Sequence, residues 1–213
     1  MSPPANPSCG LVLLAAGAST RMGRPKQLLP MYGGRPLLRQ MAESALIEPV
    51  SHVVVVLGAN AVEIAPSLDG LPVRLVVNAG WAEGMGSSLR CGMDALLAAA
   101  PAVHSVIVAL GDQPDILTGH VAKLIEAQRT TGRTIVASEC DGVRGPPVLF
   151  AAKHFPALRT LQGDAGARAL LKAHAIEVAT VTLAAARDLD TPADFAAYLE
   201  KNAPRIAQID ADK

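Results

Sequence analysis

Residues 11–30 have the sequence LVLLAAGASTRMGRPKQLLP, in which an unbroken apolar run leads into a loop of small and basic residues. The apolar run at 11–16 ends in Gly17, as a strand buried on both faces of a parallel sheet does. Small residues let the backbone approach a ligand closely, and successive free N–H groups form a concavity that binds anions. Arg21 and Lys26 add a planar fork and a point charge for phosphate oxygens. The segment therefore predicts a buried strand followed by a phosphate-binding loop.

Two better-known phosphate-binding loops do not fit this segment. A Walker loop has four residues between its glycines and then Gly-Lys, whereas here five residues separate Gly17 from Gly23, and Arg24 follows. The dinucleotide-binding fingerprint Gly-x-Gly-x-x-Gly has its second glycine where this chain has Ser19. The loop therefore matches neither of these two motifs.

The rest of the chain alternates short β-branched runs with longer helical patterns. Strands are predicted at 52–57, 73–77, 106–110, 134–137 and 176–181. Helices are predicted at 36–46, 87–99, 119–129, 153–158 and 165–173, and a last helix is predicted to open at Thr191-Pro192 and end near residue 201. This alternation predicts an α/β fold of three layers, with a doubly wound, mostly parallel sheet covered by helices on both faces.

In such a sheet, ligands bind beyond the carboxyl ends of the strands. The loops after Ala16, Asn78, Leu110 and Ala137 are therefore the candidate binding loops. Neither an internal repeat nor a low-complexity linker interrupts the pattern, so we expect a single domain over residues 9–202, with loose tails at 1–8 and 203–213.

Composition narrows the class of protein. Hydrophobic residues make up 50% and charged residues 18%, which suits a globular core. No apolar run approaches the roughly 18 residues of a membrane span. The start of the chain has three prolines and no Lys or Arg before Cys9, so it lacks the charged region of a secretory signal. The widely spaced Cys9, Cys91 and Cys140 favour reduced thiols, and we expect a cytoplasmic protein.

The formal net charge is zero, which supports neither a nucleic-acid nor a membrane partner. The distribution of charge is uneven, because residues 1–42 contain no Asp or Glu and five basic residues, namely Arg21, Arg24, Lys26, Arg35 and Arg39. A local positive field suits a small anionic ligand. By charge count alone, a solvated basic face explains it equally well.

The loop at 14–30 resembles the signature of nucleotidyltransferases built on a Rossmann-like sheet, and most closely that of the molybdenum cofactor cytidylyltransferases and their relatives. Four further segments match that family in order and spacing from about residue 9 to residue 200. They are NAGWAEGMGSSLR at 78–90, GDQP at 111–114, GPPVLF at 145–150 and DLDTPAD at 188–194.

The resemblance implies a magnesium-dependent enzyme that moves a nucleoside monophosphate from its triphosphate onto a phosphorylated small molecule and releases pyrophosphate. CTP is the expected nucleotide, the molybdopterin cofactor the expected acceptor, and a molybdoenzyme or chaperone the expected protein partner. Gln113 and Pro146 stand where many cofactor enzymes have Met and His. Both positions lie toward the acceptor, so a sister enzyme with another nucleotide or a sugar-phosphate acceptor is an alternative. A non-catalytic nucleotide-binding regulator is a second alternative, which would require a damaged catalytic set, whereas Arg21, Lys26, Asp112 and Asp190 are all present.

The resemblance also assigns residues to roles. Arg21, Lys26 and Asp112 are the expected catalytic residues, and Asp112 and Asp190 the expected metal ligands, with Asp188 in reserve. Nucleotide contacts are expected from Leu14, Ala15, Ala16, Gly17, Ser19, Arg21, Lys26, Asn78, Gly84, Ser87 and Asp112. Acceptor contacts are expected from Gln113, Gly145, Pro146, Pro147 and Gly163.

Elementary chemistry supports some of these roles and leaves alternatives for others. Mg²⁺ prefers one or two carboxylates plus substrate phosphates and water, and Asp112 directly follows a predicted strand. Asp112 is equally suited to an Asx turn before Pro114, and Asp190 to capping the last helix. Ser87 is predicted to begin a helix whose free N–H groups favour phosphate, or to serve only as its N-cap.

Ala16 is expected to influence which nucleotide base, a pyrimidine or a purine, the site accepts. Related guanylyltransferases usually have glycine at the matching position, which leaves room for a purine against the backbone. The methyl group of Ala16 narrows that space and therefore predicts a preference for the smaller pyrimidine of CTP.

Overall fold

The computed structural model describes residues 8–116 and 118–211, and its centre is a seven-stranded sheet with the strand order β3-β2-β1-β4-β6-β5-β7. The strands are β1 (Cys9–Ala15), β2 (Val50–Leu57), β3 (Arg74–Val77), β4 (Ser105–Leu110), β5 (Ile135–Cys140), β6 (Val143–Ala151) and β7 (Val178–Thr182). The α-helices are α1 (Leu37–Ala45), α2 (Ala61–Ile64), α3 (Met85–Ala99), α4 (Thr118–Thr131), α5 (Phe155–Leu158), α6 (Arg168–Ala173) and α7 (Pro192–Ala211).

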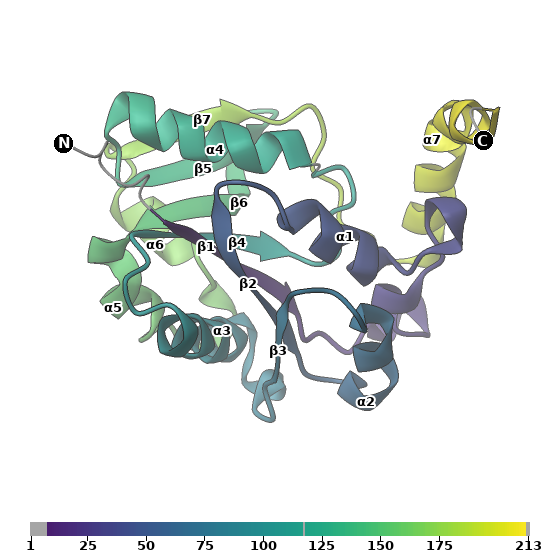
Figure 1. Cartoon of the computed structure of the whole chain (residues 1–213), viewed down its shortest axis with the longest axis horizontal. Coiled ribbons are helices and arrows are strands. Elements are labelled where there is room, and N and C mark those ends of the chain that lie inside the picture. The colour runs from purple at the N-terminus through teal and green to yellow at the C-terminus, as the bar shows by residue number, and fades with distance from the viewer. Residues whose placement is uncertain (1–7, 117, 212–213) are drawn as a thin grey trace.

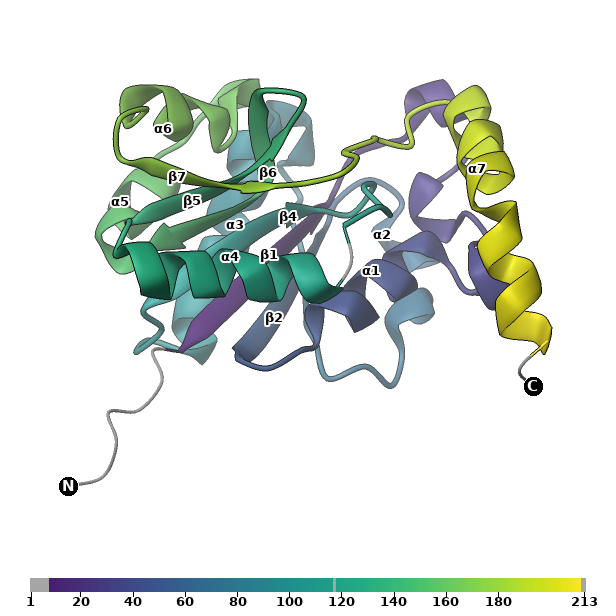
Figure 2. The same ribbon diagram turned by 90° about the horizontal axis from the view of Figure 1, so that it is seen from above.

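Six of these strands run in one direction, and β6 runs antiparallel to its neighbours β4 and β5. Figures 1 and 2 show α1 and α4 on one face of the sheet and α3, α5 and α6 on the other. The prediction of a three-layer, doubly wound and mostly parallel fold is confirmed.

Strand β1 is apolar throughout because helices cover both faces of the sheet. All seven of its residues are buried. Leu11 and Leu13 lie in the core shared with α1 and α4, whereas Val12 and Leu14 lie in the core shared with α3. The strand therefore has no solvent-facing side, and the alternation of polar and apolar residues seen in a half-exposed strand is absent.

The two ends of the predicted domain differ from expectation. Ser8 is tied to the body of the protein, since its hydroxyl donates to the carbonyl of Ala102 at 3.3 Å. Helix α7 continues to Ala211, ten residues beyond the end predicted near residue 201. Residues 1–7 and 212–213 of the predicted tails lie outside the described residues.

Candidate active site

Three loops meet where β1 and β4 end. Within the sheet, Leu14 of β1 is paired with Leu110 of β4, and the Gly111 N–H extends the pairing by donating to the Leu14 carbonyl at 2.9 Å. The Leu189 N–H donates to the Asp112 carbonyl at 3.0 Å. Segments more than 70 residues apart in the sequence are thereby joined at one edge of the sheet.

This edge borders a cavity of about 400 Å³. Of the residues predicted to bind the nucleotide, those that line the cavity are Leu14, Ala15, Ala16, Gly17, Lys26, Gly84 and Asp112. Residues that were not predicted also line it, namely Gln27, Trp81, Ala82, Met85, Ser88, Leu110, Gly111 and Asp164. The cavity is therefore formed by the predicted loops after β1, β3 and β4 together with the segment around Asp164.

The loop after β1 has the free donors that an anion site needs. The backbone N–H groups of residues 17–19 donate no hydrogen bond to any other residue among those described. Ser19 has the left-handed conformation, with φ 57° and ψ 34°, which turns the chain sharply at this point. Successive N–H groups in such a turn form a concavity of positive partial charge.

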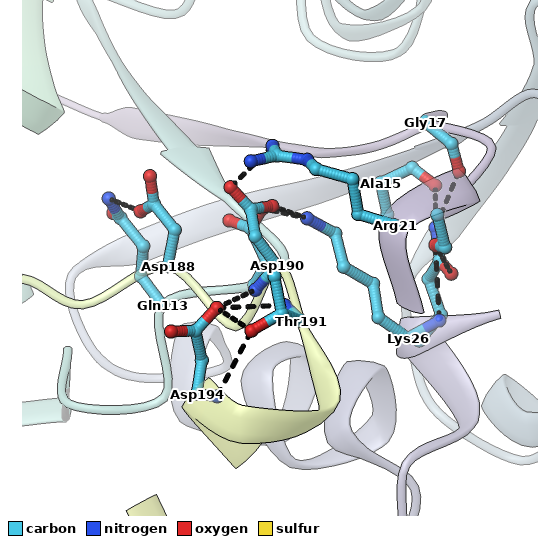
Figure 3. Close-up of polar contacts among 12 residues, drawn as sticks. Ala15, Gly17, Arg21, Lys26, Gln113, Asp188, Asp190, Thr191 and Asp194 are labelled. Carbon is cyan, nitrogen blue, oxygen red and sulfur yellow. Dashed lines mark hydrogen bonds and ion pairs between the residues drawn. The ribbon is translucent and has the colours of Figure 1, made fainter. Parts of the chain in front are cut away.

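Opposite charges gather beside this loop, as Figure 3 shows. The Lys26 Nζ lies 2.5 Å from Asp112 Oδ2 and 2.8 Å from Asp190 Oδ1. Arg21 Nη2 lies 2.7 Å from the other oxygen of Asp190. The three predicted catalytic residues and the second predicted metal ligand thus form one connected group, although they come from three distant parts of the chain.

The protonation of this group follows from its surroundings. Burial favours the neutral amine of Lys26, but the attraction of Asp112 and Asp190 is stronger and raises its pKa above the usual value. Burial likewise raises the pKa of the Asp190 carboxyl, but Lys26 and Arg21 outweigh it and hold that pKa below the usual value. Asp112 is more deeply buried, and burial raises its pKa despite the adjacent Lys26. Lys26 is therefore a cation beside an ionised Asp190.

Asp190 does not cap helix α7. Its neighbours do, because the Asp194 carboxylate accepts hydrogen bonds from the Thr191 N–H at 2.8 Å and the Thr191 hydroxyl at 2.7 Å. The Thr191 hydroxyl in turn accepts from the Asp194 N–H at 3.2 Å. This reciprocal cap leaves the Asp190 carboxylate available to Lys26 and Arg21.

Ser87 is the third residue of a helix rather than its first residue or its N-cap, contrary to the prediction. Helix α3 begins at Met85 with Gly84 as its N-cap residue, and the buried Ser87 hydroxyl donates to the carbonyls of Gly80 and Gly84, both at 2.9 Å. Asn78, also buried, donates to the hydroxyls of Ser87 and Ser88. In this structure the side chains of Asn78 and Ser87 hold the loop at 78–84, and neither lines the cavity.

Gly84 allows two loops to touch. It has φ 108° and ψ −179°, a conformation that is essentially restricted to glycine. A Cβ at this position would lie 2.5 Å from Asp164 Oδ1 and 2.7 Å from the backbone carbon of Gly163. The cavity therefore depends on glycine at this position for its wall around Asp164.

Gly84→Ala should consequently lower the free energy of unfolding by about 1–3 kcal/mol for the backbone strain, with an added cost for the clash. Gly70→Ala is the matched control, because Gly70 has φ 79° but a Cβ there would meet nothing within 4 Å. Urea unfolding of both variants measures the difference. Equal destabilisation of the two would show that the contact with the Asp164 loop contributes nothing.

The predicted acceptor residues lie outside the cavity. Gln113 is buried, and its Nε2 donates to Asp188 Oδ1 at 2.8 Å, so Asp188 pairs with Gln113 rather than with Lys26. Gly145, Pro146 and Pro147 belong to β6, whose first residues lie at the same edge of the sheet as the cavity. Gly163 packs against Gly84 and Gly86. These residues flank the site without lining the cavity.

Among the described residues, the protein side chains alone form no ready metal site, and no helix is suited to span a membrane. In ranges 8–116 and 118–211, no group of three or more His, Cys, Asp or Glu side chains is arranged to hold a metal ion. Within the same ranges, no helix is long and apolar enough to cross a membrane.

A Rossmann-like sheet with a small-residue loop, a lysine and two aspartates at its carboxyl edge is the architecture of a nucleotidyltransferase. The chain belongs to the family of proteins with a MobA-like NTP transferase domain, whose model matches residues 11–178. The resemblance drawn from the sequence motifs is thereby confirmed at the level of the family.

The chain is also similar to individual proteins of other bacteria. The chain is 43% identical over 169 residues to nicotine blue oxidoreductase of Paenarthrobacter nicotinovorans, an alignment that covers 76% of this chain and 80% of that protein. It is 29% identical over 195 residues to the purine catabolism protein PucB of Bacillus subtilis, covering 86% and 92% of the two chains.

Solved structures agree with the fold. The Mycobacterium tuberculosis Rv0371c homologue from Mycobacterium sp. strain JC1 is 31% identical in sequence to this chain and superposes with a TM-score of 0.77. The match covers 94% of this chain and 98% of the homologue. Rv0371c from Mycobacterium tuberculosis, solved as a complex with manganese, is 26% identical in sequence to this chain, with a TM-score of 0.74. The match covers 91% of this chain and 98% of Rv0371c.

Proposed function

We propose that this protein is a cytidylyltransferase that moves CMP from CTP onto a phosphorylated small molecule, with the molybdopterin cofactor as the acceptor. The observation that carries the proposal is the contact of Lys26 with Asp112 and Asp190, because Lys26 and Asp112 line the same cavity as residues 14–17. A cytoplasmic location and a molybdoenzyme or chaperone as protein partner belong to the same proposal, by resemblance to the cofactor enzymes.

The reaction is an in-line displacement at phosphorus. An oxygen of the acceptor phosphate attacks the α-phosphorus of CTP, a new P–O bond forms, and the bond from the α-phosphorus to the bridging oxygen breaks to release pyrophosphate. Such a reaction requires orientation and neutralisation of charge rather than a protein nucleophile. The free N–H groups of residues 17–19, with Arg21 and Lys26, provide positive charge for the phosphates.

The residues present suit a divalent cation. Asp112 Oδ1 is buried and has no hydrogen-bond partner, and Asp112 shares the Lys26 ammonium with Asp190. Two carboxylates completed by substrate phosphates and water are what Mg²⁺ prefers, so Asp112 and Asp190 would hold it. When bound, the ion would neutralise charge that develops on the phosphates. The manganese complex of Rv0371c supports a divalent cation in this family.

The similarity to nicotine blue oxidoreductase makes oxidoreduction a second candidate function. Against it, Ser19 replaces the second glycine of the dinucleotide fingerprint in the loop after β1. A panel of nucleoside triphosphates and phosphorylated acceptors, scored by pyrophosphate release, tests the first function. Oxidation of NADH or NADPH with nicotine blue tests the second. Cofactor oxidation without any pyrophosphate release would favour the oxidoreductase.

The preference for CTP should be measurable as a difference in affinity. Ala16 is only 7% exposed and lines the cavity, so its methyl group limits the space for a base. One methyl group is worth about 1–3 kcal/mol, or roughly 10–200-fold in discrimination. Calorimetric titration with CTP and GTP in the presence of Mg²⁺ should show tighter CTP binding. Ala16→Gly should relax the preference toward GTP.

Tighter binding of GTP than of CTP by the unmodified protein would refute this account of the base site and leave the transfer chemistry in place. Ala18→Gly is the matched control, because Ala18 belongs to the same loop but does not line the cavity. Its ratio of affinities for the two nucleotides should equal that of the unmodified protein.

A further inference from the structure

Gln27 has an amide side chain that is only 2% exposed, although it lines the cavity. Its Nε2 donates to the carbonyl of Ala15 at 2.9 Å and to that of Gly17 at 3.1 Å. Its Oε1 accepts a hydrogen bond from the Ser19 hydroxyl at 3.2 Å. Both amide hydrogens and the amide oxygen are therefore bound, and their partners are the last residue of β1 and two residues of the loop that follows it.

These bonds hold the backbone between Ala15 and Ser19. The carbonyl of Ala16, between the two held by Gln27, accepts from the Ala59 N–H at 3.0 Å. Three successive carbonyl oxygens are thus bound by protein, while the N–H groups of residues 17–19 stay without partners among the residues described. A carbonyl oxygen turned toward a triphosphate would repel it, whereas a free N–H group attracts it.

The same amide also connects the loop to Lys26. The Ser19 hydroxyl, which donates to Gln27, accepts a hydrogen bond from the Lys26 backbone N–H at 3.1 Å. Ser19 is a non-glycine residue at φ 57°, a backbone conformation that persists only where its surroundings hold it. Figure 3 shows Ala15 and Gly17 on the side of the Lys26 backbone, away from Asp188 and Gln113.

We propose that Gln27 is a positioning residue for nucleotide binding: its side-chain amide holds the loop after β1 with its carbonyls turned away from the cavity and its N–H groups toward the phosphates. The identity of the ligand rests on the proposed function. Gln27 acts through the loop and touches none of the reacting atoms, so its effect is on the affinity for nucleotide more than on the chemical step.

Gln27→Met tests this role, because it keeps the length and nearly the volume of the side chain and removes all three hydrogen bonds. The dissociation constants of CTP and of inorganic pyrophosphate, each measured by calorimetry with Mg²⁺, should both rise roughly 10- to 100-fold. The KM for CTP should rise by a similar factor, while kcat at saturating CTP should change much less. Gln128→Met on α4, outside the cavity, is the matched control and should bind both ligands as the unmodified protein does.

A second variant separates hydrogen bonding from packing. Gln27→Asn keeps the amide but is one methylene too short to reach both carbonyls, so it should also weaken the binding of CTP and pyrophosphate. If Gln27→Met does not fold, Gln27→Asn provides the same test. Folded variants that bind CTP and pyrophosphate as tightly as the unmodified protein would overturn the positioning role of Gln27 and leave the proposed function in place. Failure of the unmodified protein to bind either ligand would overturn the proposed function and this inference with it.

Discussion

Asp112→Ala is expected to lower kcat/KM by about three orders of magnitude, because charge stabilisation at a transferring phosphate amounts to several kcal/mol and each factor of ten corresponds to 1.4 kcal/mol. Asp112 follows β4 at the sheet edge, contacts Lys26 at 2.5 Å, and has a buried oxygen without a partner. The fold should persist, since burial already disfavours the ionised carboxylate. Pyrophosphate release and thermal unfolding measure the two effects.

Asp112→Asn refines this experiment, because it keeps the shape of the side chain and removes its negative charge. It should be nearly as inactive as Asp112→Ala if the charge is what matters. Asp94→Ala is the control, since Asp94 is an exposed carboxylate on α3 that pairs with Arg159. Full activity of Asp112→Ala with Mg²⁺ would contradict the assignment of Asp112 as a metal ligand.

Lys26→Ala is expected to lower kcat/KM for CTP by roughly a hundredfold to a thousandfold, comparable to the loss of one preorganised donor to a developing anion. The ammonium lies within 2.8 Å of both Asp112 and Asp190, so its removal also leaves two carboxylates facing each other. An ammonium beside phosphate can stabilise the bound substrate and the transition state, so both KM and kcat should change. Steady-state kinetics at limiting and saturating CTP separate the two.

Lys26→Arg should rescue poorly, because a planar guanidinium does not replace a compact charge between two carboxylates. Lys153→Ala removes an exposed lysine that pairs with Glu177 and should leave the kinetics unchanged. Kinetics of Lys26→Ala equal to those of the unmodified protein at limiting CTP would mean that the basic segment is only a solvated surface.

The strands and helices that carry this site were predictable because their patterns are local. The unbroken apolar run at 11–16 indicated a strand covered on both faces, and β1 is buried along its length. The direction of β6 was not predictable in the same way, since it depends on pairing with β4 and β5 across long stretches of sequence. The continuation of α7 beyond residue 201 was not predicted either.

Within the site, the structure brings three residues of the sequence motifs together at one edge of the sheet, whereas the buried Gln27 beside them was not predicted. Lys26, Asp112 and Asp190 meet as the family pattern implies. Ser87 was misplaced because a serine after glycine is also the pattern of an N-cap, and only the structure shows its hydroxyl bonded to the carbonyls of the preceding loop. Gln27 was missed because a glutamine in a polar loop gives no sign of burial, although its position beside Lys26 was a usable hint.

The proposed function requires transfer of the α-phosphoryl group together with its nucleoside. Two preparations of CTP, one radiolabelled at the α-phosphate and one at the γ-phosphate, test it when each is incubated with the protein, Mg²⁺ and the phosphorylated acceptor. A cytidylyltransferase should place the α-label on the acceptor and the γ-label in pyrophosphate. Appearance of the γ-label on the acceptor, or retention of both labels in CTP with every acceptor that the panel offers, would contradict it.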